Sequence, residues 1–592
     1  MERIEPETRG PRWFPPDRFG HFIQWFLLVL SSGILLTNGY YLKFAEPTVS
    51  RKTLSLVVIF ITSLWIVTRR YGIPCTYAEI VAITRRRAAL LLLGIILLVA
   101  FGLRLSGIAH GLPQSYVPDE YDYVHSYLAM IKRGDLNPHW WYHPSLQPYL
   151  NVATFLVVFF LQVPTGRWSS VHQVSVEDML YWGRFGVGVV SGTATVLVTY
   201  LLGRKLFGTR IALMSAALLA VFPGAVEVSQ YNKPDPLLTL MTALSVLVTL
   251  SYLAKGERKL AFAAGIVFGL TVAAKYNGAL VLLPFLLAVI LRHGRRALVE
   301  ADLYLGAAGS VIGFFVGCPY VIAELPKFFD HVADGLYSYG FTGREGAMGI
   351  NNWFTHARYT IIYGAGWWPF VAGLAGIALM LYRLDAKLAV FLTFPVIYYS
   401  YYSSQNINFP GNLIPVYPFL AILAAYGGYE AAVWLSRLLK ARVKFMSSFA
   451  LEPYFVMVIL ILLLWFPVNM SLAHNRLVNL PDTGNIAREW INGHFPPGTH
   501  FGVERHAPVL DPKRYRITQE ARVINRGVAN YRDEGVEYLI TTEIAYKRFG
   551  PEHRQTRNYE KLFRICPLVK EFQPVEGTVG GPNIRILRVP PE

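Results

Sequence analysis

Long apolar runs recur along this chain from about residue 21 to residue 470, with short polar loops rich in Lys and Arg between them. Each run is close to the roughly 20 residues that a helix needs to cross the hydrocarbon core of a bilayer. A further apolar run at 145–163 is ambiguous. The pattern predicts an all-α polytopic membrane protein with about 13 transmembrane helices. The expected spans are 21–41, 54–70, 88–108, 184–203, 210–226, 236–254, 260–275, 278–292, 303–322, 360–381, 388–403, 412–435 and 451–470.

The basic loops decide how the ambiguous run is interpreted, because short cytoplasmic loops carry an excess of Lys and Arg. If 145–163 does not cross, every strongly basic loop lies on the same side as the N-terminus, which is then cytoplasmic. If it does cross, all the basic loops after it face outward. We therefore predict that 145–163 is a juxtamembrane or re-entrant helix.

The same orientation places the tail 471–592 outside the cytoplasm. This tail has no spanning run, and it alternates strand-like pieces (498–504, 536–541, 583–589) with helix-like ones (483–494, 559–563). It predicts a small extracytoplasmic α/β domain. The expected organisation is an extra two-helix membrane segment (1–87), a main transmembrane domain (88–470) and the C-terminal domain (471–592).

Composition supports the membrane class and excludes others. Hydrophobic residues make up 53% of the chain and charged residues only 16%, which is too apolar for a soluble core. The net charge of +17 is spread over short loops, so membrane topology explains it better than nucleic-acid binding. The three cysteines are too few and too scattered for a disulfide framework or a thiolate metal site.

Ionisable residues gather where the expected spans end on the outer face. Asp119 and Glu120 follow the span 88–108, in a predicted surface helix Pro118–Arg133 that ends before Gly134. The helix dipole favours ionised carboxylates there. Such an acid can deprotonate an incoming hydroxyl or hold a divalent cation such as Mg²⁺ or Mn²⁺. The alternative is that Asp119 only caps the helix and Glu120 faces water.

A second acid, Asp235, opens a later span on the same face and makes Asp119 and Asp235 a candidate metal pair. His143 could be a metal ligand, a hydrogen-bond donor to substrate, or a satisfied interfacial histidine. Charges beside hydrocarbon are costly, so sites that keep them are functional candidates.

Lys233 and Lys275 supply the fixed positive charge that a phosphate leaving group needs. The alternative is that both side chains snorkel to the interface. Arg344, in the long outer loop 323–359, is a weaker candidate for the same role. Arg104 and Arg184 are costly charges within or beside spans, which pairing with an acid or a lipid phosphate would offset.

A family resemblance rests on these residues and their order. The motifs PDEYDY, HPSLQPYL, RFGVGVVSGTATVLVTYLLGRKLFG, SQYNKPDPLLTL, AAKYNGALVLLP and NLIPVYPFLAILAA resemble the C-type superfamily of lipid-carrier-dependent glycosyltransferases (GT-C). The branch most similar to the chain contains the protein O-mannosyltransferases and the lipid A aminoarabinose transferase. The resemblance covers about Ala88 to Ala425.

The resemblance implies an inverting transfer of a sugar, a hexose (mannose-like) or a pentose. The donor would be a polyprenyl-phosphate-linked sugar embedded in the lipid of the membrane. The acceptor would be a hydroxyl of a protein, lipid or glycan on the extracytoplasmic face.

By position, the resemblance makes Asp119 the base, with Glu120 beside it. The resemblance also implies that His143, Asp235 and Lys275 occupy motif positions of the family's site. Many relatives have an Arg before the late P-x-x-P motif, where this chain has Asn412.

Two other functions are also compatible with a polytopic helical membrane protein of this kind. A transporter or flippase of lipid-linked sugars should place ionisable residues at the bilayer midplane and show paired broken helices. A glycan ligase or polymerase would use a similar donor and pass on a whole glycan. The clustering of acids on one face and the lack of an internal repeat favour the transferase.

Overall fold

The computed structural model describes residues 77–113, 119–337, 352–405, 409–547, 550 and 552–591. The chain divides into two compact units, Met1–Leu91 and Leu92–Glu592. Of the first unit only residues 77–91 are described, as the start of helix α3 (Tyr77–Leu105). The predicted spans 21–41 and 54–70 lie outside the described residues.

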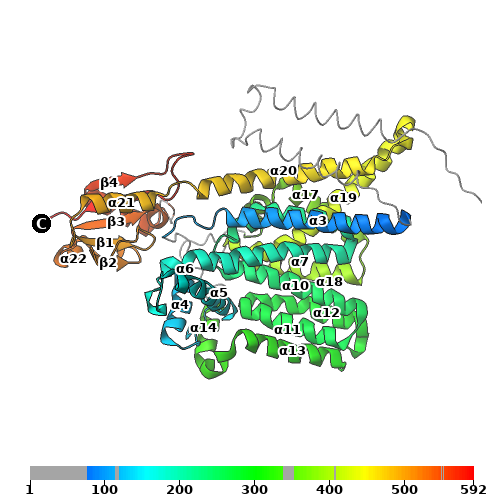
Figure 1. Cartoon of the computed structure of the whole chain (residues 1–592), viewed down its shortest axis with the longest axis horizontal. Coiled ribbons are helices and arrows are strands. Elements are labelled where there is room, and N and C mark those ends of the chain that lie inside the picture. The colour runs from blue at the N-terminus through cyan, green and yellow to red at the C-terminus, as the bar shows by residue number, and fades with distance from the viewer. Residues whose placement is uncertain are drawn as a thin grey trace, which may run out of the picture. The chain divides into compact units, whose positions relative to one another are not determined.

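The second unit is built around a bundle of apolar helices (Figure 1). Its core contains α19 (Tyr417–Arg442), which is buried on nearly every side over its first twelve residues because its apolar side chains surround the helix. The bundle helices are α7 (Val190–Phe207), α8 (Thr209–Val221), α10 (Pro234–Lys255), α11 (Arg258–Ala274), α12 (Leu282–His293), α13 (Ala301–Gly317), α17 (Trp367–Tyr382), α18 (Ala386–Ser403), α19 (Tyr417–Arg442) and α20 (Glu452–Val478).

Helices α11 and α13 form the closest pair in the bundle, and glycine makes this possible. A Cβ at Gly265 would overlap the carbonyl oxygen of Gly306, and one at Gly313 would overlap that of Ile266. Small residues let helix backbones approach closely in a membrane, where apolar burial alone gives little drive to associate.

Seven helical runs within the described residues are long and apolar enough to cross a membrane, and up to nine if each of two bent pairs is one span. One bent pair joins α13 to α14 (Leu325–Tyr337) at 85°. The chain is therefore a polytopic helical protein, and the count of thirteen spans stays a prediction.

Three helices that follow α3 lie beside the bundle: α4 (Glu120–Arg133), α5 (Leu146–Gln162) and α6 (Val176–Gly183). The predicted helix is confirmed over Glu120–Arg133, and α4 ends at Gly134 in the left-handed conformation (φ 68°), while the predicted start at Pro118 lies outside the described residues. Helix α5 is apolar and long enough to span, yet it does not follow the direction shared by α7, α10 and α20 (Figure 1). Whether it crosses stays a prediction.

The predicted C-terminal α/β domain is confirmed. Its five-stranded sheet has the order β2-β1-β3-β5-β4, parallel for β2-β1-β3 and antiparallel for β3-β5-β4. The predicted elements appear as β1 (His500–Glu504), β3 (Tyr538–Thr542), β5 (Ile584–Arg588), α21 (Thr483–His494) and α24 (Arg554–Ile565). The sequence did not predict the two edge strands, β2 (Arg516–Glu520) and β4 (Leu568–Phe572).

Candidate functional site

A cavity of about 1230 Å³ opens within the second unit, between helix ends on one side of the bundle and the C-terminal domain. Its walls come from segments far apart in the sequence, because helix ends and the loops between them meet on one side of the bundle. Five residues singled out from the sequence line this cavity: Asp119, His143, Lys233, Asp235 and Lys275.

Asp119 is the residue before helix α4, and its backbone is left-handed (φ 69°). That conformation costs a non-glycine residue on the order of 1–3 kcal/mol and is found most often at functional sites. Its side chain makes no capping hydrogen bond to the helix. The interpretation of Asp119 as a simple helix cap is therefore wrong, and its carboxylate lines the cavity instead.

Glu120 is fully buried and does not face water, so that alternative is also wrong. Both of its carboxylate oxygens accept hydrogen bonds from Arg184, each at 2.8 Å. Oε1 also accepts the backbone N–H of Asn232 at 2.8 Å. Glu120 is not among the cavity-lining residues, and this placement favours a positioning role over contact with substrate.

Arg184 holds three separate segments together. Besides the pair with Glu120, its Nη1 donates to the carbonyl oxygens of Ile108 at 2.7 Å and His110 at 2.8 Å. Of the two partners expected for Arg184, an acid or a lipid phosphate, the structure shows an acid, Glu120. Arg104 differs, because its guanidinium donates to backbone carbonyls, including those of Ala220 and Leu219.

Lys275 and Asp235 form an ion pair inside the cavity wall, with Nζ donating to Oδ1 at 2.8 Å. Their side chains are only 14% and 10% exposed, so Lys275 does not snorkel into open solvent. Its Nζ also lies 3.5 Å from Oδ1 of Asn412, at the motif where many relatives carry an Arg.

Lys233 precedes Pro234 at the start of α10 and is half-buried. Within the part of the chain that the structure describes, no hydrogen bond or ion pair engages its ammonium group. Lys233 therefore offers the cavity a positive charge that is not already neutralised by a neighbouring carboxylate.

His143 lies against two aromatic rings, with ring centroids 5.3 Å from Tyr123 and 5.4 Å from Trp140. Burial, and after it the charge of Lys275, lowers the pKa of His143 to about 4, although the charges of Asp235 and Asp119 oppose the change. The imidazole is therefore neutral at pH 7 and can donate one hydrogen bond and accept another.

A resident divalent cation does not fit Asp119 and Asp235 as they are placed. Among the residues that the structure describes, no three His, Cys, Asp or Glu side chains gather to hold a metal. An oxygen of Asp235 already accepts the ammonium of Lys275. Arg344, the remaining predicted substrate contact, lies outside the described residues.

The C-terminal domain contributes cavity residues that the sequence did not indicate, among them Arg505, His506 and Arg522. Arg505 donates to Asp122 of helix α4 at 2.6 Å. These partners are 383 positions apart, and no motif links them. The tail was interpreted as a separate domain, so its participation could not be foreseen.

Comparisons with known proteins agree with the predicted resemblance. Residues 174–320 match the family model described as dolichyl-phosphate-mannose-protein mannosyltransferase. No curated protein matches the chain. The structure of ArnT from Cupriavidus metallidurans bound to undecaprenyl phosphate is similar, with a TM-score of 0.51 and 15% identity over 84% of this chain and 97% of that one.

The archaeal oligosaccharyltransferase AglB from Archaeoglobus fulgidus, in complex with an inhibitory peptide and a dolichol-phosphate, is also similar. The TM-score is 0.50 and the identity 15%, over 78% of this chain and 70% of that one. At these identities the likeness is one of fold. The predicted resemblance is therefore confirmed by the fold and by the family match over residues 174–320.

Proposed function

We propose that this chain is an inverting membrane glycosyltransferase that moves a sugar from a polyprenyl-phosphate-linked donor to a hydroxyl acceptor. The observation that carries the proposal is the convergence of the carboxylate-bearing Asp119 with Lys233 and Lys275 in one cavity. The family match over residues 174–320 supports it, and so does the similarity to ArnT, whose structure contains undecaprenyl phosphate.

In this mechanism the acceptor hydroxyl attacks the anomeric carbon while Asp119 takes its proton. The new C–O bond forms as the bond between the anomeric carbon and the carrier phosphate oxygen breaks, which inverts the configuration. The electron pair leaves with the polyprenyl phosphate. Lys275 and Lys233 stabilise the negative charge that grows on this phosphate.

The remaining cavity residues orient these groups. Asp235 fixes the ammonium of Lys275 through the 2.8 Å ion pair. The neutral imidazole of His143 offers a hydrogen bond to a sugar hydroxyl or a phosphate oxygen. The cavity of about 1230 Å³ exceeds the roughly 300–1,000 Å³ of most small-molecule sites, which suits a donor head group and an acceptor bound together.

The transferred sugar is a hexose, mannose-like, or a pentose, and the acceptor is a protein, lipid or glycan hydroxyl. The test uses the full chain in lipid nanodiscs with synthetic undecaprenyl-phosphate and dolichyl-phosphate sugars. Release of polyprenyl phosphate that depends on an added membrane or envelope fraction supports the proposal. Mass spectra of lipids and surface glycans from cells with and without the gene then identify the product, and identical spectra together with no release contradict it.

The same assay separates the alternatives. A flippase moves the lipid-linked sugar across the bilayer without releasing polyprenyl phosphate. A ligase or polymerase releases carrier only from donors that bear a longer glycan. The charged residues of the cavity stand at helix starts and ends, as Asp235 does in the first turn of α10 and Lys275 after α11, which favours the transferase over the transporter.

The proposed orientation has a cytoplasmic N-terminus and an extracytoplasmic C-terminal domain. Single cysteines at Gly166, between α5 and α6, and at Gly527 in the C-terminal domain should react with a membrane-impermeant reagent in intact cells. One at Gly256, between α10 and α11, should react only after permeabilisation. The reverse pattern contradicts the orientation.

A further inference from the structure

Residues 135–145 connect α4 to α5 as an irregular segment that forms part of the cavity wall. Among the described residues, no backbone–backbone hydrogen bond involves residues 136–144. The segment is therefore held by side chains, and buried backbone without regular pairing depends on such partners.

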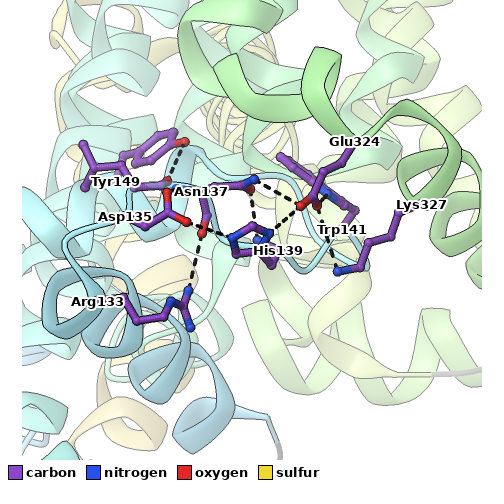
Figure 2. Close-up of polar contacts among 9 residues, drawn as sticks. Arg133, Asp135, Asn137, His139, Trp141, Tyr149, Glu324 and Lys327 are labelled. Atoms are coloured by element: carbon purple, nitrogen blue, oxygen red, sulfur yellow. Dashed lines mark hydrogen bonds and ion pairs between the residues drawn. The ribbon is translucent and has the colours of Figure 1, made fainter.

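One carboxylate supplies much of this support. Figure 2 shows Glu324, the last residue of the 3-10 helix Pro319–Glu324 and directly before α14, facing the segment. Its Oε1 accepts hydrogen bonds from Asn137 Nδ2, at 3.1 Å, and from His139 Nδ1. Its Oε2 accepts the indole N–H of the fully buried Trp141 at 2.8 Å. Glu324 thus anchors every second residue of this stretch by a hydrogen bond, namely Asn137, His139 and Trp141.

The residues next to those contacts line the cavity. Trp140, Tyr142 and His143 are all cavity residues. Helix α14, which follows Glu324, adds a second anchor, because the backbone N–H of Trp141 donates to Nδ1 of His331 at 3.1 Å and the ring of Tyr142 stacks on that of His331 at 4.2 Å. Loss of the Glu324 contacts would therefore loosen this part of the cavity wall, while the contacts of His331 remain.

The chemistry of the cluster requires a carboxylate at position 324. All three partners from the segment present N–H groups, so only an acceptor without its own hydrogen can satisfy them. His139 also faces Asp135 Oδ2 through Nε2 at 2.8 Å, and both ring nitrogens can donate only in the imidazolium form. The hydrogen bonds that His139 donates to Asp135 and to Glu324 raise the pKa of its imidazole, the bond to Asp135 most.

We propose that Glu324 is a positioning residue for the transfer reaction: it fixes Trp140, Tyr142 and His143 where they contact the donor. Its effect on catalysis rests on the proposed function, whereas the fastening itself is independent of that function. The charged neighbours of the cluster are Arg133, which donates to the carbonyl of Asn137 at 3.5 Å, and Lys327, whose Nζ lies 4.0 Å from Glu324 Oε2.

The test compares Glu324→Gln with Lys327→Gln in the full chain. Gln places an NH₂ donor among N–H donors. Lys327→Gln instead removes a nearby charge in α14 whose side chain is 45% exposed and makes no hydrogen bond to the described segment. Hydrogen exchange of residues 136–145 should speed up by about tenfold or more in Glu324→Gln, because hydrogen bonds to charged groups are lost. It should be unchanged in Lys327→Gln.

The kinetic readout separates positioning from a general loss of structure. Glu324→Gln should raise the donor KM several-fold more than it lowers kcat per folded molecule. Trp141→Phe, which loses one N–H but keeps the ring, should give a smaller change in the same direction. It serves as the decisive variant if Glu324→Gln does not fold.

If hydrogen exchange of residues 136–145 is unchanged in Glu324→Gln, or is accelerated equally in Lys327→Gln, Glu324 does not anchor this segment. A kcat loss with an unchanged KM overturns the positioning role. A wild-type chain that transfers no sugar refutes the proposed function, and with it the positioning role, while the exchange comparison still reports on the fastening by itself.

Discussion

The carboxylate of Glu120 and the guanidinium of Arg184 form a two-point ion pair in which neither side chain is exposed. Glu120 directly follows Asp119, and its Oε1 also holds the backbone of Asn232, the residue before Lys233. One buried pair therefore keeps the proposed base and a proposed phosphate-binding lysine in a fixed relation.

Glu120→Gln should destabilise the protein by about 3 kcal/mol, because removing one member of a buried pair leaves the other charge uncompensated. Thermal unfolding of the purified full chain measures this. Asp122→Asn is the matched control, since the Asp122–Arg505 pair is about half exposed on both sides and should contribute less than about 1 kcal/mol. Equal stability of Glu120→Gln and wild type would show that the pair does not hold the site together.

Lys275→Met should lower kcat by about 10²–10³-fold with little change in the donor KM, the scale for losing one preorganised group that stabilises transition-state charge. The parameters are measured per folded molecule. Lys233→Met provides the comparison, because Lys233 has no acid partner among the described residues and should contribute more to binding the ground-state phosphate. Near-normal kcat in Lys275→Met would show that Lys275 has a structural role and does not stabilise the transition state.

Removal of divalent cations should change the transfer rate by less than about twofold, because the described cavity residues offer no complete set of oxygen ligands. The experiment is incubation with EDTA, followed by the donor-release assay. A loss of transfer activity that added Mg²⁺ or Mn²⁺ reverses would contradict this prediction. It would also place metal ligands in segments outside the described residues.

Glu504 should make stability depend on pH. It is buried in β1, and burial raises its pKa from 4.5 to about 7, against hydrogen bonds from Tyr559 and from the backbone of Thr542 and Val523. Because the folded state then holds a proton that the unfolded state loses, stability is greatest below pH 4.5. It falls by about 3 kcal/mol as the pH rises to 7.

Glu504→Gln removes this titration, so its unfolding temperature should change less with pH over that window than that of the wild type. The two proteins are compared at several pH values in the same detergent. Parallel pH profiles would mean that Glu504 is ionised in the folded state throughout.

Local signals were enough to predict several elements of the site. Gly134 marks the end of α4, and the positions of Asp119, Asp235 and Lys275 at span ends on one side placed them in a common region. The positive-inside pattern supplies that information without any tertiary contact. The elements β1, β3 and β5 followed from their apolar alternation.

Other features depend on tertiary contacts that leave no trace in local sequence. A glutamate in the first turn of a helix, such as Glu120, normally faces solvent. Its burial is favourable here because it forms an ion pair with Arg184, which is distant in the sequence. Arg505 and Glu324 reach the site from distant segments. Edge strand β4 is largely exposed, so it lacks the apolar alternation that identifies a strand.

The most direct test of the central claim is the turnover of Asp119→Asn in the donor-release assay, normalised to folded protein. Asn is nearly isosteric with Asp but cannot accept the proton of the acceptor. We predict a loss of about 10²–10⁴-fold, the range for removing a general base, with unchanged membrane insertion and unfolding temperature. Retention of more than about a tenth of wild-type turnover would contradict the assignment of Asp119 as the base and the mechanism built on it.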